Sequence, residues 1–260
     1  VPEAPHRQAP EAPPEPLDDM FDVDNTAWSG REEPAKAPEQ QAWSGTEDFG
    51  GAEGAAGLHD NWDDPDGYYR VMLGEKLQQR YQIFAILGRG IFATVVRARD
   101  LQQNGREVAI KIARRQETMY KAGMKEISIL QRLSEADPDN KMFIVHFFSH
   151  FEHRGHLCMV FESLGLNLRE IVKRFGKDVG LNLQAVKTYT KQMLLALALL
   201  REKQFVHADI KPDNILVNEA KTIAKLADFG SASTTSEMEI TPYLVSRFYR
   251  APEIILGQPH

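Results

Sequence analysis

The sequence predicts an α+β protein with two lobes, the first built on a β-sheet and the second mainly on helices. Two observations carry this prediction: short β-rich runs dominate residues 81–161, and apolar residues at helical spacing dominate the chain after residue 162. The chain has 260 residues, of which 42% are hydrophobic, so it can bury a substantial core. This length and composition exclude a collagen-like chain and a disulfide-stapled mini-protein.

Residues 1–67 differ in composition from the rest of the chain. They hold 17 acidic and three basic residues, nine of the 14 prolines, and almost no aliphatic run. Such a segment cannot bury enough apolar surface to offset the entropy lost on ordering. We expect a disordered, acidic, proline-rich tail over residues 1–67 and a folded region over residues 68–260.

The folded region carries an excess of eight positive charges. Its basic residues are scattered and not interleaved with aromatic residues, so we expect no sequence-specific binding of nucleic acid. Cys158 is the one cysteine and cannot form an intramolecular disulfide. The chain has no run of about 20 apolar residues, and its N-terminus lacks the features of a signal peptide. We therefore expect no membrane association and a nuclear or cytosolic location.

Five β-rich runs succeed one another in the first lobe. They lie at residues 81–87, 94–100, 107–112, 143–151 and 157–161. We expect these runs to form a five-stranded antiparallel sheet. Residues 120–133 interrupt them with apolar residues at helical spacing, which predicts one helix in this lobe.

The second lobe is expected to be mainly helical. Residues 166–175 and 184–203 read as helices, and residues 215–217 and 224–227 read as short strands around loops. Within the longer helix, residues 193–200 are apolar on nearly every face, which indicates that other elements should surround them.

A glycine-containing turn, LGRGIFATV, follows the first strand at residues 87–95. Gly88 and Gly90 would let backbone N–H groups approach phosphate oxygens closely, because no Cβ obstructs them. Ala93 stands at the third glycine position, and a strand follows instead of a helix, which argues against a dinucleotide-binding turn. Taken alone, the turn is better explained by an ordinary hairpin.

Lys111 ends the apolar strand sequence VAIK. A lysine within an apolar strand is costly to bury unless a carboxylate or phosphate pairs with it. Glu126 lies on the inward side of the expected helix and is the candidate partner. The alternative, a snorkelling lysine and a solvated glutamate, stays open on these residues alone.

Three further motifs follow in the second lobe. HADIKPDN occupies residues 207–214, DFG follows at residues 228–230, and APE follows at residues 251–253. With the glycine turn and VAIK before them, these are the motifs of protein kinases in the required order. Each residue alone has an ordinary structural explanation, but chance does not explain the whole set.

Over residues 68–260 the chain resembles a eukaryotic protein kinase of the CMGC group, whose activation segment resembles TPYLVSRFYR at residues 241–250. The stretches DNWDDPDGYYRV, EADPDNK, KDVGL, HADIKPDNILVNE and DFGSAS are similar to the pre-mRNA processing factor four family of splicing-associated Ser/Thr kinases. The resemblance implies a bilobal kinase fold with N-lobe 81–161, hinge 162–164 and partial C-lobe 165–260. It also implies phosphorylation of spliceosomal proteins and a location in the nucleus.

The resemblance assigns roles to the motif residues, with ATP and Mg²⁺ as cofactors. Asp209 would accept or orient the proton of the substrate hydroxyl, and Lys211 would contact the γ-phosphate. Lys111 would bridge the α- and β-phosphates, oriented by Glu126. The expected Mg²⁺ ligands are Asn214 and Asp228. The residues expected to bind ATP are Leu87, Gly88, Gly90, Val95, Ala109, Lys111, Phe161, Glu162, Leu164 and Leu216.

The residue between His207 and Asp209 is Ala208, where many kinases have an arginine that pairs with a phosphate on the activation segment. Arg247, four residues after Tyr243, is the available substitute. A phosphate on Tyr243 would carry close to two negative charges and could bond the Arg247 guanidinium in a bidentate manner. We expect Tyr243 to be autophosphorylated and held by Arg247.

The sequence has few residues after Glu253, whereas a kinase C-lobe has several further helices beyond the APE motif. The expected C-lobe is therefore incomplete. Two functions stay open: an active Ser/Thr kinase, because every catalytic residue is present, or a catalytically incompetent kinase that acts as a binding or decoy module.

Overall fold

The structure is a computed structural model that describes residues 62–177, 179–238 and 244–257. The expected disordered tail, residues 1–67, lies outside the described residues except for its last six. Those six residues pack on the N-lobe, so the folded region includes residues 62–67, which the sequence assigned to the tail. Asp63 accounts for part of this difference, because it bonds the buried His156 of the N-lobe at 2.7 Å.

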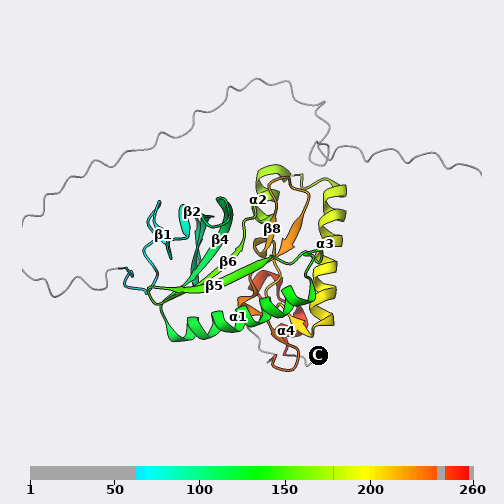
Figure 1. Ribbon diagram of the computed structural model, residues 1–260. Coiled ribbons are helices and arrows are strands. Elements are labelled where there is room, and N and C mark those ends of the chain that lie inside the picture. The colour runs from blue at the N-terminus through cyan, green and yellow to red at the C-terminus, as the bar shows by residue number, and fades with distance from the viewer. Residues whose placement is uncertain (1–61, 178, 239–243, 258–260) are drawn as a thin grey trace, which may run out of the picture.

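The N-lobe is a six-stranded antiparallel sheet of order β1-β2-β3-β4-β6-β5 (Figure 1). All five expected runs form strands, and a short strand at the edge, paired with β2, makes a sixth that the sequence did not predict. The strands are β1 (Lys76–Leu77), β2 (Tyr81–Arg89), β3 (Ala93–Asp100), β4 (Arg106–Ala113), β5 (Phe147–His153) and β6 (His156–Glu162).

β5 begins four residues later than the expected run at residue 143. Phe143 has a positive φ of 56°, which a strand does not accommodate. Ile144 instead forms a parallel bridge with Leu226 of the second lobe. The apolar residues 143–145 therefore form contacts between the lobes.

Helix α1 (Glu117–Ala136) lies beside the sheet and extends toward the second lobe (Figure 1), where it contacts the turn Phe229–Ser231. It contains the expected helix and extends beyond it at both ends. Its buried residues recur at helical spacing, as an amphipathic helix requires, and are Gly123, Glu126, Ile127, Ile129, Leu130 and Leu133.

The second lobe is mainly helical. The expected helix 166–175 divides into α2 (Leu168–Ile171) and a π-helical turn (Val172–Gly176), and the long helix is α3 (Leu183–Glu202). A short helix, α4 (Pro252–Ile255), lies near the end of the described chain. The short strands are β7 (Phe205–Val206), β8 (Ile215–Val217), β9 (Ala224–Leu226) and β10 (Ser233–Thr234).

Two clusters of buried side chains form the core. The smaller fills one face of the N-lobe sheet, and includes Ile83, Val96 and Ile110. The larger runs from α1 and β6 into α3, β8 and β9, so it joins the two lobes. The expectation that α3 is surrounded holds for one side only, since Leu194 is 61% exposed in the described part of the chain. No helix in that part is long and apolar enough to cross a membrane.

Candidate active site

Lys111 is the point at which three separate elements meet. Its Nζ lies 2.8 Å from both carboxylate oxygens of Glu126 on α1 and 2.9 Å from Oδ1 of Asp228. The strand fixes the lysine, and the helix presents the glutamate on its buried face. The pairing of Lys111 with Glu126 that the sequence predicted is therefore present, and the snorkelling alternative is wrong.

The charges at this point support one another. Burial alone would lower the pKa of Lys111, but the negative charges of Glu126 and Asp228 outweigh it and raise that pKa. Partial burial works to raise the pKa of Asp228, yet the positive charge of Lys111 outweighs it and lowers that pKa. Lys111 is therefore cationic and Asp228 anionic near neutral pH.

Asp228 owes its position to an unusual backbone conformation. It adopts left-handed angles, φ 60° and ψ 77°, just before the 3-10 turn Phe229–Ser231. The ring of Phe229 is buried and packs edge-on against His207, with ring centroids 4.8 Å apart. This packing holds the DFG motif against the HADIKPDN segment, residues 207–214, which we call the catalytic loop. It also presents the Asp228 carboxylate to Lys111.

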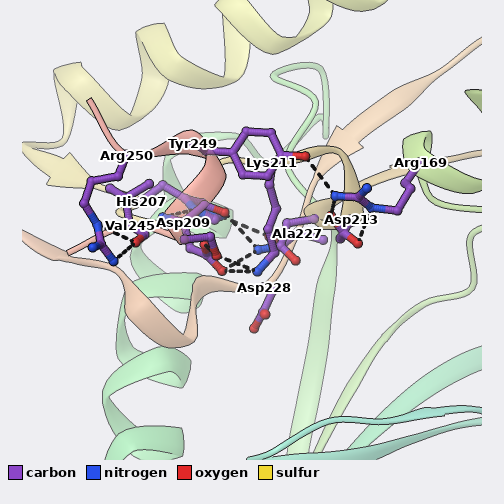
Figure 2. A network of polar contacts seen from close by, with 12 residues as sticks. Arg169, His207, Asp209, Lys211, Asp213, Ala227, Asp228, Val245, Tyr249 and Arg250 are labelled. Carbon is purple, nitrogen blue, oxygen red and sulfur yellow. Dashed lines mark hydrogen bonds and ion pairs between the residues drawn. The ribbon is translucent and has the colours of Figure 1, made fainter. Parts of the chain in front are cut away.

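Asp209 is held by three side chains of the second lobe (Figure 2). Its Oδ2 accepts from Lys211 Nζ at 2.7 Å and from Asn214 Nδ2 at 3.0 Å, and its Oδ1 accepts from the Ser246 hydroxyl at 2.6 Å. Burial would raise the pKa of Asp209, but the bonds from Lys211 and Ser246 outweigh it and lower that pKa. Asp209 is therefore a carboxylate that already accepts one hydroxyl group.

A second group of charged residues lies beside the contacts of Asp209. Arg169 on α2 forms a bidentate pair with Asp213, at 2.7 and 2.9 Å, and donates to the Tyr249 hydroxyl at 2.8 Å. Figure 2 shows Arg169 and Asp213 on one side of Asp209 and Lys211, Arg250 on the other, and Tyr249 between them with its hydroxyl toward Arg169. The activation segment is thus tied to the catalytic loop through Tyr249 as well as through Ser246.

The expected nucleotide-lining residues of the sheet share one face. Val95 lies opposite Lys111 in the β3–β4 register, and Ala109 stands two residues before Lys111. The alternate residues Val96 and Ile110 point to the other face and are fully buried in the N-lobe core. Val95 and Ala109 therefore lie on the Lys111 side of the sheet.

The expected hinge begins at Glu162 and ends at Leu164. The backbone N–H of Glu162 donates to the carbonyl of His146, and the carbonyl of Leu164 accepts from Arg97 at 2.9 Å. Within the described ranges, the backbone N–H groups of Ser163 and Leu164 have no acceptor. These two groups are the hinge donors available to an adenine ring.

The remaining expected ATP residues surround this hinge and the glycine turn. Phe161 packs edge-on against Phe147, with centroids 5.6 Å apart. Leu216 lies on β8 and pairs with Asn167 at the start of α2. Of the other three, Leu87 and Gly88 lie at the exposed end of β2, and Gly90 lies in the turn that follows.

The side chains of Asn214 and Asp228 fit a magnesium ion. The Asn214 amide nitrogen donates to the backbone carbonyl and to the carboxylate of Asp209, which leaves the amide oxygen available to a metal ion. Asp228 supplies a half-exposed carboxylate with one oxygen engaged by Lys111. One carboxylate and one amide oxygen, completed by water and phosphate, are the kind of ligand set that Mg²⁺ takes.

Tyr243 and Arg247 are the residues expected to regulate the activation segment. Tyr243 lies outside the described residues, whereas Arg247 is exposed in the turn Arg247–Tyr249. Among the described residues, Arg247 has no hydrogen-bond or ion-pair partner. Ala208 is buried, and its methyl group has no donor with which to bond a phosphate.

Sequence reasoning missed several residues of this site. Ser246 had no assigned role, although it bonds Asp209. Lys225 and Asn140 were not singled out either, although the Lys225 ammonium bonds both Glu162, at 2.6 Å, and Asn140, at 3.0 Å. A lysine in the buried strand β9 was the available signal, because such a lysine requires a partner.

The comparisons with known proteins agree with this geometry. The protein kinase domain matches residues 81–260. The chain is 58% identical over 205 residues to "Serine/threonine-protein kinase prp4" of Schizosaccharomyces pombe, covering 79% of this chain and 43% of that protein. It is 51% identical over 205 residues to "Serine/threonine-protein kinase prpf4B" of Dictyostelium discoideum, covering 78% and 25%. A third relative, "DYRK-family kinase pom1" of S. pombe, is 41% identical over 197 residues, covering 75% and 18%.

The chain thus spans less than half the length of these curated relatives. The family match extends over more than half of the chain itself, and it includes every motif that converges on Lys111 and Asp209. The chain therefore belongs to the protein kinase family, and the relatives named above that it resembles include two Ser/Thr protein kinases.

Proposed function

We propose that this protein transfers the γ-phosphoryl group of ATP to Ser or Thr hydroxyls of proteins. The observation that carries the proposal is the position of Lys111 between Glu126 and Asp228, within 2.9 Å of each. This arrangement keeps a cation on the face of the sheet where Val95 and Ala109 lie. Phosphoryl transfer depends mainly on such positioned charge.

The chain's own residues divide the work. When bound, Mg-ATP supplies the phosphoryl group that is transferred. Asn214 and Asp228 would hold the metal ion, and Lys111 would hold the α- and β-phosphates. Asp209, ionised and oriented by Lys211, would accept or orient the proton of the substrate hydroxyl. Lys211 would also contact the γ-phosphate.

A thermal melt with Mg-ATP tests nucleotide binding by the whole chain. Ligand at about 100 times its dissociation constant should add about 2.7 kcal/mol and raise the melting midpoint by a few degrees. Asp228→Asn should abolish most of this shift, whereas the control Glu135→Gln, at an exposed residue near the end of α1, should keep it. Equal shifts in the wild type and Asp228→Asn would contradict the assignment of the metal site, and no shift in the wild type would contradict the function.

We also propose that Tyr243 is autophosphorylated and that Arg247 holds the phosphate. The support is that Arg247 is exposed and has no partner among the described residues, while Ala208 cannot bond a phosphate. A phosphate on Tyr243 would form charge-assisted bonds to Arg247 and order the activation segment.

The test substitutes each member of the pair. Tyr243→Phe and Arg247→Ala should both lose most activity toward an exogenous peptide, while Tyr120→Phe, at an exposed tyrosine of α1, should retain it. Mass spectrometry should find phosphate on Tyr243 in the wild type and in Arg247→Ala. Full activity of Tyr243→Phe would rule the proposal out.

Spliceosomal proteins in the nucleus are the substrates that we propose. The support is the resemblance to the pre-mRNA processing factor four family, together with similarity to prp4 and prpf4B. Phe161→Gly should remove the side chain behind the adenine site and admit an ATPγS analogue with a bulky N6 group. Thiophosphate labelling in nuclear extract should then mark splicing factors, with the inactive Phe161→Gly/Asp209→Asn variant as the control. Labelling that is not enriched in splicing factors would contradict this substrate class.

A further inference from the structure

A short segment before β1, residues 62–69, lies against the N-lobe and reaches the glycine turn; we call it the strap. Its fold is local. The carboxylate of Asp64 accepts from the backbone N–H groups of Asp66 and Tyr68, at 3.0 and 2.9 Å. Gly67 closes the turn with a positive φ of 80°, and its carbonyl accepts from the backbone N–H of Arg115 at 2.8 Å.

The strap is anchored at both ends. Near its start, Asp63 bonds the buried His156, and the Arg154 guanidinium stacks on the Trp62 ring, 3.3 Å from its centroid. At its end, Tyr69 is buried and donates its hydroxyl to Glu75 at 2.8 Å. These contacts fix the backbone on either side of Tyr68.

Tyr68 connects the strap to the glycine turn. Its hydroxyl lies 2.9 Å from the carbonyl oxygens of both Gly90 and Ile91, to which its single proton can donate in a shared bond. The guanidinium groups of Arg89 and Arg114 lie 3.7 and 4.5 Å from the centroid of its ring. The side chain is 9% exposed, although the turn that it contacts is open to solvent.

The two carbonyls that Tyr68 bonds determine the direction of two N–H groups. In a trans peptide the carbonyl and the following N–H point in opposite directions, and the described residues contain no cis peptide. Fixing the carbonyls of Gly90 and Ile91 therefore turns the N–H groups of Ile91 and Phe92 away from the strap. Neither N–H has an acceptor in the part of the chain that the structure describes.

We propose that Tyr68 is a positioning residue that aims the N–H groups of Ile91 and Phe92 at the phosphates of the bound nucleotide. The inference rests on the proposed ATP-binding function. Backbone N–H groups held in advance lose little entropy on binding an anion. Without the Tyr68 hydroxyl, the Gly90 carbonyl loses this donor and the Ile91 carbonyl keeps only Arg114 Nη1, at 3.2 Å. The peptides at the tip of the turn are then held less firmly, and nucleotide binding must order them further.

The test compares nucleotides that differ in their phosphates, using the full chain. Tyr68→Phe removes the hydroxyl and keeps the ring between the two arginines. We expect it to weaken ATP and ADP binding about three- to tenfold, in the range of one lost hydrogen bond, and to leave adenosine binding unchanged. Tyr69→Phe is the matched control, because it removes a neighbouring strap hydroxyl that does not touch the turn. It should change none of the three affinities.

Each outcome of the titration has one meaning. Unchanged ATP affinity in Tyr68→Phe, or an equal loss for adenosine and ATP, would overturn the inference, because either shows no specific effect on the phosphates. An ATP-specific loss of equal size in Tyr69→Phe would also overturn it and would point to general loosening of the strap. A wild-type chain that binds neither adenosine nor ATP would contradict the proposed function itself. Thermal melts of both variants check that each is folded.

Discussion

His207 shows how one side chain can order a catalytic loop. Its Nε2 lies 3.0 Å from the carbonyl oxygen of Ala227, and its Nδ1 lies 3.2 Å from the backbone N of Asp209. The two contacts assign the neutral tautomer with the proton on Nε2, because Nδ1 must accept. Protonation of Nδ1 would remove the bond that holds the backbone at Asp209.

The burial of His207 leads to a prediction about pH. Burial lowers the pKa of His207 below its ordinary value of 6.5, although Asp228 and Asp209 partly oppose this effect and Lys211 adds to it. Because the unfolded chain then binds the proton more readily, this contribution to stability is complete above about pH 6.5. It is lost as the pH falls from there through the lowered pKa.

Urea unfolding between pH 5.5 and 8 measures this effect. His207→Gln should be less stable than the wild type at pH 7.5 by about 1–3 kcal/mol, because a buried hydrogen bond is lost. Its stability should also fall less steeply below pH 6.5. The exposed His150→Gln should keep the wild-type slope, and an unchanged slope in His207→Gln would contradict the prediction.

At the scale of elements, β9 is joined to the hinge by a buried ionic cluster. Lys225 on β9 is 6% exposed and bonds Glu162, at the end of β6, and Asn140, in the loop after α1. Glu162 also accepts from the backbone N–H of His146 at 2.6 Å. The cluster therefore fixes the start of the hinge relative to the strand that leads to the DFG motif.

Removing one charge of this cluster should be costly. Lys225→Met leaves the Glu162 carboxylate without its cation, and we expect a loss of about 3 kcal/mol in the free energy of unfolding. The double variant Lys225→Met/Glu162→Gln should regain most of this loss, because the amide oxygen can still accept from His146. Denaturant titration measures both, with the exposed Lys187→Met as the control. A single variant within about 0.5 kcal/mol of the wild type would contradict this account.

At the scale of the whole molecule, one apolar core belongs to both lobes. Leu226 lies in it, 1% exposed, and its backbone bonds Phe143 and Val145 across the lobe boundary, each at 2.9 Å. The N-lobe sheet has its own smaller core on its other face. Because the larger core spans the boundary, we expect the lobes to unfold together.

Leu226→Ala tests this coupling. The loss of a buried leucine side chain should cost about 2–5 kcal/mol. Amide hydrogen exchange should report reduced protection in β2 and β3 of the N-lobe as well as in α3. Loss of protection confined to α3 would show that the lobes unfold independently.

The sequence by itself predicted five of the six N-lobe strands, the helices α1 and α3, and the residues that meet around Lys111 and Asp209. Alternating and helical apolar spacing are local properties, which is why α1 and α3 lie close to their expected ranges. The kinase motifs are recognised from residue types and their order along the chain, without a structure. They were therefore enough to predict Lys111, Glu126, Asp209 and Asp228 as site residues.

Only the tertiary structure decided which side chains meet. The contact between Tyr68 and the glycine turn spans 22 and 23 residues, and that between Lys225 and Glu162 spans 63. A sequence pattern shows that a buried lysine needs a partner, but not which distant residue supplies it. The strap, the hinge cluster and the bond from Ser246 to Asp209 depend on such pairings, because their energy comes from geometry that only the folded chain creates.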